Sequence, residues 1–341
     1  MRTIKARPSR RQTAPHFGAT PSPAAALRPT DLYLGVDGGG TKTQAVVVDA
    51  RNRTLGAGVS GPSNPLRVGV QPAAAAVRDA IDRACAEAGV RRNEVAALEI
   101  GLAGVKRADL RERVREALAA LHVDPIEIVT DADIALYGAT NGEPGLVLIA
   151  GTGSICCGKN ARRKFASAGG WGPLVGDEGG GSWIARHALQ AIARSTDGRG
   201  PQTVLGREAC EYFNVSTPDD LSTAIYAPNV TNERLAGFGR CVIEAAHKRD
   251  AVSRDIIAHA GRELGIAAAA VIRQLRMQRE KFQVAYVGGV FNAAEMVLGP
   301  LREIVAGVAA GAFLAPPQLP PAVAAARMAR AHVLRRLALA G

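Results

Sequence analysis

Two glycine-rich turns hold the residue types best suited to chemistry in this sequence. Glycine lets the backbone approach a ligand closely, and consecutive N–H groups in such a turn can form an anion-binding nest. A carboxylate beside the nest offers the oxygen ligand that Mg²⁺ prefers. The alternative for the first turn is an ordinary tight hairpin without a ligand. We expect both turns to bind phosphate, the first through Asp37, Gly38, Gly39, Gly40, Thr41, Lys42 and Thr43, and the second through Gly151, Thr152, Gly153 and Ser154.

A third glycine-rich segment, residues 169–181, also contains Trp171 and Asp177. A Gly-Gly-Trp turn can present an indole and bare amides to a sugar ring, and a carboxylate can accept hydrogen bonds from two hydroxyls. The alternative is a structural loop whose Trp171 fills a gap in the core. We favour a ligand-binding loop, because a core-filling tryptophan does not explain the adjacent acids and glycines.

Two carboxylates, Asp131 and Asp133, follow the apolar run 126–130. A carboxylate at the carboxyl end of a strand projects into the crevice where α/β sheets bind ligands, and there it could take a proton from an attacking hydroxyl. We expect this role for Asp131, although a helix cap is the alternative. Asp133 is expected to be a helix N-terminal charge.

The elements that position these groups repeat along the chain. Strands are expected at 32–36 and 44–48, joined by the first glycine turn, and again at 146–150 and 155–157, joined by the second. Further strands are expected at 95–103, 126–130 and 283–287, and helices at 72–88, 108–121, 182–195, 234–248, 251–277 and over the last twenty residues. The alternation predicts an α/β fold of two duplicated domains that face one cleft.

Composition sets limits on the function. The 341 residues carry a net charge of +11, of which +6 lies in residues 1–30, where there is no acid. We expect this Pro/Ala/Ser-rich segment to be a disordered tail, so the basic charge does not indicate nucleic-acid binding. No run of 18 apolar residues exists, which excludes a membrane span. Five cysteines without a CxxC pair indicate a cytoplasmic protein without a zinc or disulfide framework.

In chain order, the segments DGGGTKT, GPSN, TDAD, GTGS, GGWGPLVGDEG and VGGVF resemble the N-acetylglucosamine kinase branch of the sugar kinase, Hsp70-like and actin ATPase superfamily. Relatives of that branch include glucosamine kinases, N-acetylmuramate kinases and activator ATPases of radical dehydratases. The activators hold an iron–sulfur cluster between subunits. Cys156 and Cys157 are adjacent in an expected strand and point to opposite faces, so they suit such a cluster poorly.

The resemblance implies two actin-like ATPase (ribonuclease H-like) domains with a central cleft. The implied boundaries are 31–140 and 141–341, and the last helix (about 322–341) is expected to pack back on the first domain. The resemblance also implies ATP and Mg²⁺ as cofactors, with Asp37 near the metal and Thr152 near the γ-phosphate. The remaining implied sites are adenosine at Gly288 and Gly289, the sugar at Asn64, Gly170, Trp171 and Asp177, and the catalytic base at Asp131.

The resulting expectation is an ATP-dependent amino-sugar kinase that phosphorylates the 6-hydroxyl of N-acetylglucosamine or a close relative. Phosphoryl transfer depends on positioning and charge stabilisation, which suits a sequence with many glycine loops and few acid–base groups. Glucosamine or N-acetylmuramate as substrate is an alternative, and so is a sugar sensor or partner-driving ATPase without kinase activity. The resemblance also implies a homodimer.

Overall fold

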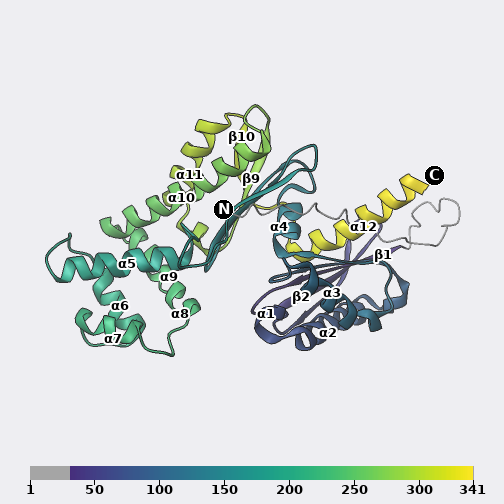
Figure 1. The fold of residues 1–341 in the computed structure, drawn as a ribbon, viewed down its shortest axis with the longest axis horizontal. Coiled ribbons are helices and arrows are strands. Elements are labelled where there is room, and N and C mark those ends of the chain that lie inside the picture. The colour runs from purple at the N-terminus through teal and green to yellow at the C-terminus, as the bar shows by residue number, and fades with distance from the viewer. Residues whose placement is uncertain (1–30, 341) are drawn as a thin grey trace, which may run out of the picture.

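Two five-stranded sheets with the same internal strand order organise the computed structural model, which describes residues 31–340 (Figure 1). The expected tail at 1–30 lies outside the described residues. The first sheet has the order β3-β2-β1-β4-β5, formed by β1 (Leu32–Gly38), β2 (Thr43–Asp49), β3 (Thr54–Ser60), β4 (Val95–Leu102) and β5 (Ile126–Thr130). The second has the order β8-β7-β6-β9-β10, formed by β6 (Gly145–Ala150), β7 (Ser154–Lys159), β8 (Phe165–Gly169), β9 (Phe282–Val287) and β10 (Ala312–Ala315).

In each sheet the first three strands pair antiparallel and the last two add on in parallel. The expected duplication is therefore confirmed. The helices of the first half are α1 (Pro65–Val68), α2 (Val70–Ala88), α3 (Ala108–Ala117) and α4 (Asp131–Thr140). Those of the second half are α5 (Gly181–Thr196), α6 (Leu205–Phe213), α7 (Leu221–Ile225), α8 (Asn232–Gly237), α9 (Gly239–His247), α10 (Ala251–Leu275), α11 (Glu295–Val308) and α12 (Pro321–Ala340), with the 3₁₀ turn η4 (Gly289–Ala293) before α11.

The period-two pattern of the strands assigns their side chains to two apolar layers. In β1 and β2, Leu34 and Val47 pack with helix α2 on one face of the first sheet. Tyr33 and Val46 point to the opposite face, where they meet the alanines of α12. The last helix of the chain thus covers the sheet formed by its first strands.

The second sheet is covered in a matching way. Its face with Val147 and Ala285 packs against Leu136 and Ala139 of α4, the helix that follows the last strand of the first sheet. Its other face packs against α5, α9, α10 and α11. Each sheet therefore receives the final helix of the other half, and α4 and α12 lie in contact with each other (Figure 1).

Most expected elements are confirmed within a few residues, and the differences have physical causes. The helix expected over 234–248 is broken at Phe238, between Gly237 and Gly239. Strand β3 was not expected, because Gly56 and Gly58 interrupt its apolar pattern. Those glycines are needed since a Cβ at either position would lie within 2.4 Å of the α2 backbone. None of the helices within residues 31–340 has both the length and the apolar character that a bilayer span requires.

Replacing Gly35 of β1 should detach α12 from the first sheet. A Cβ at this position would lie 2.1 Å from the backbone nitrogen of Ala326 and 2.2 Å from the carbonyl oxygen of Ala322, and backbone atoms cannot move aside cheaply. We expect Gly35→Val to cost about 3 kcal/mol or more and to lower the Tm in a thermal-unfolding scan by about 5 °C or more. The control is Gly61→Ala, where a Cβ meets nothing within 4 Å. Equal Tm values for the two variants would contradict this packing.

Candidate active site

Asp37 and Asp131 stand at the same edge of the first sheet. Strands β1, β4 and β5 run parallel, and their register places Gly38 opposite Leu102 and Leu102 opposite Thr130. Two strand spacings separate β1 from β5, so the backbones at Asp37 and Asp131 are about 10 Å apart. Burial, together with the Asp131 charge, raises the pKa of Asp37 to about 6, against the opposing effect of Lys42. The two carboxylates are therefore close enough for the charge of Asp131 to act on Asp37.

Asp131 is the first residue of α4 but not its cap. Thr130 is the N-cap, and its hydroxyl accepts the Asp133 N–H at 3.2 Å. Asp133 Oδ2 in turn accepts the Thr130 N–H at 3.1 Å, which completes a capping box and confirms the expected role of Asp133. Asp131 Oδ1 accepts the N–H of Ala132 at 2.9 Å, and the side chain stays open to solvent. Burial by the flanking protein nevertheless raises the pKa of Asp131.

The turn between β1 and β2 presents unpaired amides. Gly39 N–H donates to the carbonyl of Lys42 at 3.0 Å and closes the turn. The N–H groups of Gly40, Thr41 and Lys42 have no acceptor within residues 31–340, and all three residues are exposed. Thr43 differs, because it is buried and its hydroxyl hydrogen-bonds with Gly61 O and Ser63 Oγ, each at 2.7 Å. The first turn therefore has a donor set that suits phosphate, while the Thr43 hydroxyl is used inside the protein.

The turn between β6 and β7 has the same character. Gly151 N–H donates to Gly153 O at 3.0 Å, and the described part of the chain offers no acceptor to the N–H groups of Thr152 and Gly153. The first N–H groups of α5 hydrogen-bond to the carbonyl groups of this turn. Gly181 N–H donates to Gly151 O at 2.7 Å, and Ser182 N–H donates to Thr152 O at 2.9 Å. This turn too is held rigidly with free donors facing outward.

A hollow of about 240 Å³ adjoins the second turn. It is lined by Gly151, Thr152 and Gly289 together with residues of α5, α8 and α9. Gly288 lies against the turn with φ 119°, and a Cβ there would be 2.2 Å from the carbonyl oxygen of Ala150. The structure thus brings the expected γ-phosphate residue and the expected adenosine residues to one place.

The segment 169–181 is docked on the second turn. Gly170 N–H donates to Ser154 O at 2.9 Å, and Ser154 Oγ donates to Glu178 O at 2.7 Å. Asp177 is buried, and its Oδ1 accepts the Gly172 N–H at 3.1 Å. Trp171 is 77% exposed, so the alternative that it fills a gap in the core is wrong.

Asn64 lies in the first half, behind the first turn. Its Oδ1 accepts the N–H of Leu66 at 3.0 Å and caps α1. The same oxygen packs on Gly104 in the turn that follows β4, where a Cβ would lie 2.4 Å away. The neighbouring Ser63 N–H donates to Gly39 O at 3.0 Å. The expected sugar residues are therefore divided, with Asn64 and Asp131 in the first half and Gly170, Trp171 and Asp177 in the second.

One ion pair that the sequence did not indicate joins the two halves. Arg67 of α1 pairs with Glu233 of α8. The Arg67 guanidinium lies beside Gly40 of the first turn, and Glu233 lines the hollow that contains Thr152. The pair therefore connects the surroundings of the two glycine-rich turns. Both side chains are about half exposed, so it is weak, on the order of 1 kcal/mol or less, and can break as the halves separate.

The expectation for the adjacent cysteines is confirmed. Cys156 packs into the core beneath α5 and α10, whereas Cys157 packs on the opposite face against α4. Burial raises the pKa of both thiols, which disfavours the thiolate form that binds metals. Neither side chain is placed to hold a cluster between subunits.

Comparison with known proteins agrees with this arrangement. Residues 34–329 match the model of the BadF/BadG/BcrA/BcrD ATPase family. The chain is 33% identical over 273 residues to the N-acetylmuramic acid/N-acetylglucosamine kinase of Clostridium acetobutylicum, covering 80% of this chain and 89% of that one. It is 31% identical to the N-acetyl-D-glucosamine kinase of Dictyostelium discoideum, covering 76% and 85%. A solved Chromobacterium violaceum structure, put forward as an N-acetylglucosamine kinase, superposes with a TM-score of 0.71 at 26% identity, covering 88% and 99%.

Duplicated sheets and exchanged helices define a two-domain protein of the actin-like ATPase fold, as expected from the sequence. Within that class, the chain belongs to the BadF/BadG/BcrA/BcrD ATPase family.

The contact between the second turn and the segment 169–181 can be tested at Gly153. A Cβ there would lie 2.2 Å from Asp177 Oδ2, and the buried Asp177 has little room to move. We expect Gly153→Ala to destabilise the protein by about 1–3 kcal/mol in a thermal-unfolding scan, as overpacking does. The control on the same turn is Gly151→Ala, where a Cβ meets nothing within 4 Å. A wild-type Tm for Gly153→Ala would contradict the contact.

Proposed function

We propose that this protein transfers the γ-phosphoryl group of ATP to the 6-hydroxyl of an amino sugar, N-acetylglucosamine or a close relative. The observation that carries the proposal is the pair of turns with unpaired amides, Gly40–Lys42 in the first half and Thr152–Gly153 in the second, together with Asp37 and Asp131 at the carboxyl ends of the first sheet's parallel strands. The family assignment supports the use of ATP. Two relatives that match three quarters or more of the chain are named as kinases of N-acetylated amino sugars.

The residues of this chain would divide the work as follows. The free amides of the two turns bind the β- and γ-phosphates, and the hollow beside Thr152 and Gly289 takes the nucleoside. Asp131 accepts the proton of the sugar hydroxyl as the new P–O bond forms. Asp37, alone among carboxylates at the first turn, suits a metal that keeps most of its waters and also binds phosphate oxygens. When bound, Mg²⁺ would neutralise charge on those phosphates.

The sugar would be held from both halves. Asn64 and Asp131 approach from the first, and Gly170, Trp171 and Asp177 from the second. Such a divided site is complete only when the halves are close together, which places the reacting atoms and excludes water. The Arg67–Glu233 pair favours this closed arrangement without locking it.

A panel of sugars separates this proposal from its competitors. ADP release is measured in a coupled assay with N-acetylglucosamine, N-acetylmuramate, N-acetylmannosamine and glucosamine. Release that requires one of these sugars supports the kinase. Release without any sugar would favour a partner-driving ATPase, and sugar binding without ADP release would favour a sensor. The homodimer and the cytoplasmic location stay predictions from the sequence.

Removing the charge of Asp131 tests the catalytic base. We expect Asp131→Asn to lower kcat by about 10²–10⁴-fold, the usual contribution of general-base catalysis, with little change in sugar affinity measured by calorimetry. Asp133→Asn is the matched control, because Asp133 caps α4 through Thr130. That variant should lose about 1 kcal/mol of stability and keep most of its kcat. Unchanged turnover in Asp131→Asn would remove Asp131 from its proposed role.

The raised pKa of Asp37 predicts a pH-dependent metal requirement. Only the ionised carboxylate binds a cation, and with a pKa of about 6 Asp37 becomes protonated as the pH falls below that value. The Mg²⁺ concentration for half-maximal rate should therefore rise by about tenfold for each pH unit below about 6 and level off above about 7. The measurement uses fixed ATP and sugar and varies free Mg²⁺. A requirement that is constant from pH about 5 to 8 would contradict Asp37 as the metal-facing carboxylate.

A further inference from the structure

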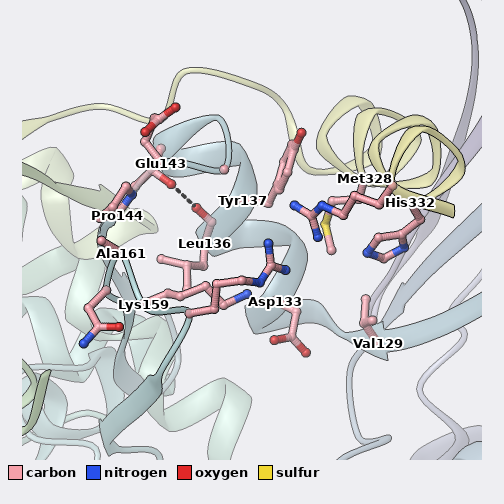
Figure 2. A pocket seen from close by; sticks show the side chains of 15 residues that line it. Val129, Asp133, Leu136, Tyr137, Glu143, Pro144, Lys159, Ala161, Met328 and His332 are labelled. Atoms are coloured by element: carbon pink, nitrogen blue, oxygen red, sulfur yellow. Dashed lines mark hydrogen bonds between the residues drawn. The ribbon is translucent and has the colours of Figure 1, made fainter. Parts of the chain in front are cut away.

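A larger cavity lies between the two halves, lined by none of the residues assigned above to ATP or the sugar. It has a volume of about 520 Å³ and opens between α4, the β7–β8 turn and α12 (Figure 2). Tyr137 reaches it from α4, Lys159 and Arg163 from β7 and its turn, and Met328, His332 and Arg335 from α12. This volume lies within the range of small-molecule sites in proteins.

The cavity gathers positive charges that have no partner. Lys159, Arg163 and Arg335 all line it, and across residues 31–340 no carboxylate lies within 4.0 Å of any of the three. Burial and the neighbouring Arg163 lower the pKa of Lys159, as expected for a cation crowded by like charge. Near Tyr137, the Nε atoms of Arg327 and Arg330 are also buried without a hydrogen-bond partner. An anion in the cavity would relieve this repulsion.

Two acidic side chains also line the cavity, Asp133 and Glu143, and the Asp133 charge favours the protonated form of Lys159, but two acids do not balance three cations. Asp133 Oδ2 is occupied by the N–H and hydroxyl of Thr130, at 3.1 and 2.7 Å. The Glu143 carboxylate points away from Lys159 (Figure 2). His332 contacts a different acidic residue, since its Nδ1 lies 3.0 Å from Oε2 of the buried Glu99. The cavity therefore keeps an excess of positive charge.

Part of the remaining lining is apolar and suits a carbon skeleton. Leu136 and Met328 supply apolar surface, with the Tyr137 ring between them in the view of Figure 2, while Thr140 and Asn160 add polar groups. Guanidinium groups match phosphate oxygens through paired N–H donors, and a lysine adds a point charge. A bare inorganic anion would satisfy the cations but leave the apolar side and most of the volume unfilled.

We propose that this cavity binds a small phosphorylated molecule of about hexose-phosphate size. Its place in the fold gives the binding a consequence. Lys159 and Arg163 belong to the second sheet and its turn, whereas Arg335 is on the helix that covers the first sheet. A ligand that contacts all three therefore connects the second sheet with the helix that packs on the first sheet, and α4, which lines the cavity, begins at Asp131. A ligand that fits one relative orientation of the halves better than another shifts their equilibrium.

The test measures binding by calorimetry on the full chain, with the cleft saturated by a non-hydrolysable ATP analogue and N-acetylglucosamine. The probes are N-acetylglucosamine 6-phosphate, fructose 6-phosphate, inorganic phosphate and citrate. We expect saturable binding of at least one sugar phosphate, weakened about tenfold or more in Lys159→Gln/Arg335→Gln, since each lost charge-assisted contact is worth about that factor. Arg163→Gln provides a single-site variant on an exposed turn.

The matched control is Arg162→Gln, which removes the same charge from an exposed neighbour outside the lining. It should bind like the wild type. No saturable binding up to about 10 mM, binding that survives Lys159→Gln/Arg335→Gln, or equal affinity for inorganic phosphate and the sugar phosphates would each overturn the proposal. So would binding of citrate alone.

The binding part of this inference does not rest on the proposed kinase activity, and only its kinetic consequence does. If no amino sugar supports ADP release, yet sugar-phosphate binding is present and lost in the double variant, the kinase proposal fails and the second site stands. If turnover is present, the bound sugar phosphate should change kcat or KM in the wild type and in Arg162→Gln. It should leave both unchanged in Lys159→Gln/Arg335→Gln.

Discussion

The close contact between α12 and β1 is the packing constraint on which the two-domain architecture depends. Gly35 lets the helix backbone at Ala322–Ala326 approach the strand to within ordinary contact, and any side chain there would collide with it. Because α4 makes the reciprocal contact with the second sheet, the chain crosses between the halves twice. The halves are thus connected by two helices that also contact each other (Figure 1).

Among residues 31–340, the two glycine turns supply N–H donors without acceptors, and neither Asp37 nor Asp131 has an ion-pair partner within 4.0 Å. The amides of the two turns are unpaired because the turns are too tight and too glycine-rich to satisfy them internally. Burial, and after it the charge of Asp131, raises the pKa of Asp37 to about 6. Such preorganised, unsatisfied groups are typical of sites that stabilise phosphoryl transfer by charge and position.

Much of this arrangement could be predicted from the sequence, because short-range rules dictate it. Glycine turns between apolar runs gave both hairpins, and the position of Asp131 after an apolar strand placed it at the correct sheet edge. Asp133 was assigned correctly from its distance to the helix start. Thr43 stays a predicted phosphate-binding residue, but its hydroxyl hydrogen-bonds with Gly61 and Ser63, a contact that depends on a loop 18–20 residues away and that the sequence did not indicate.

The features that the sequence did not reveal all arise from contacts between distant segments. Arg67 and Glu233 are separated by 166 residues, and no local pattern marks either one. The cavity around Lys159 needs α4, α12 and the β7–β8 turn to be placed before it exists. Strand β3 was not predicted because it contains glycines where β-branched or aromatic residues would indicate a strand. These glycines allow the backbone of α2 to approach β3 closely.

The exchange of terminal helices has a consequence for biosynthesis. Among residues 31–340, the face of the first sheet that carries Tyr33, Val46, Val48 and Ala97 packs against residues 322 onward. A ribosome that adds about 5–20 residues per second leaves this apolar face bare for roughly ten to forty seconds after β4 has been made. The nascent amino-terminal half therefore exposes an aggregation-prone apolar surface until translation is nearly complete. Holdase chaperones would bind that surface during the interval.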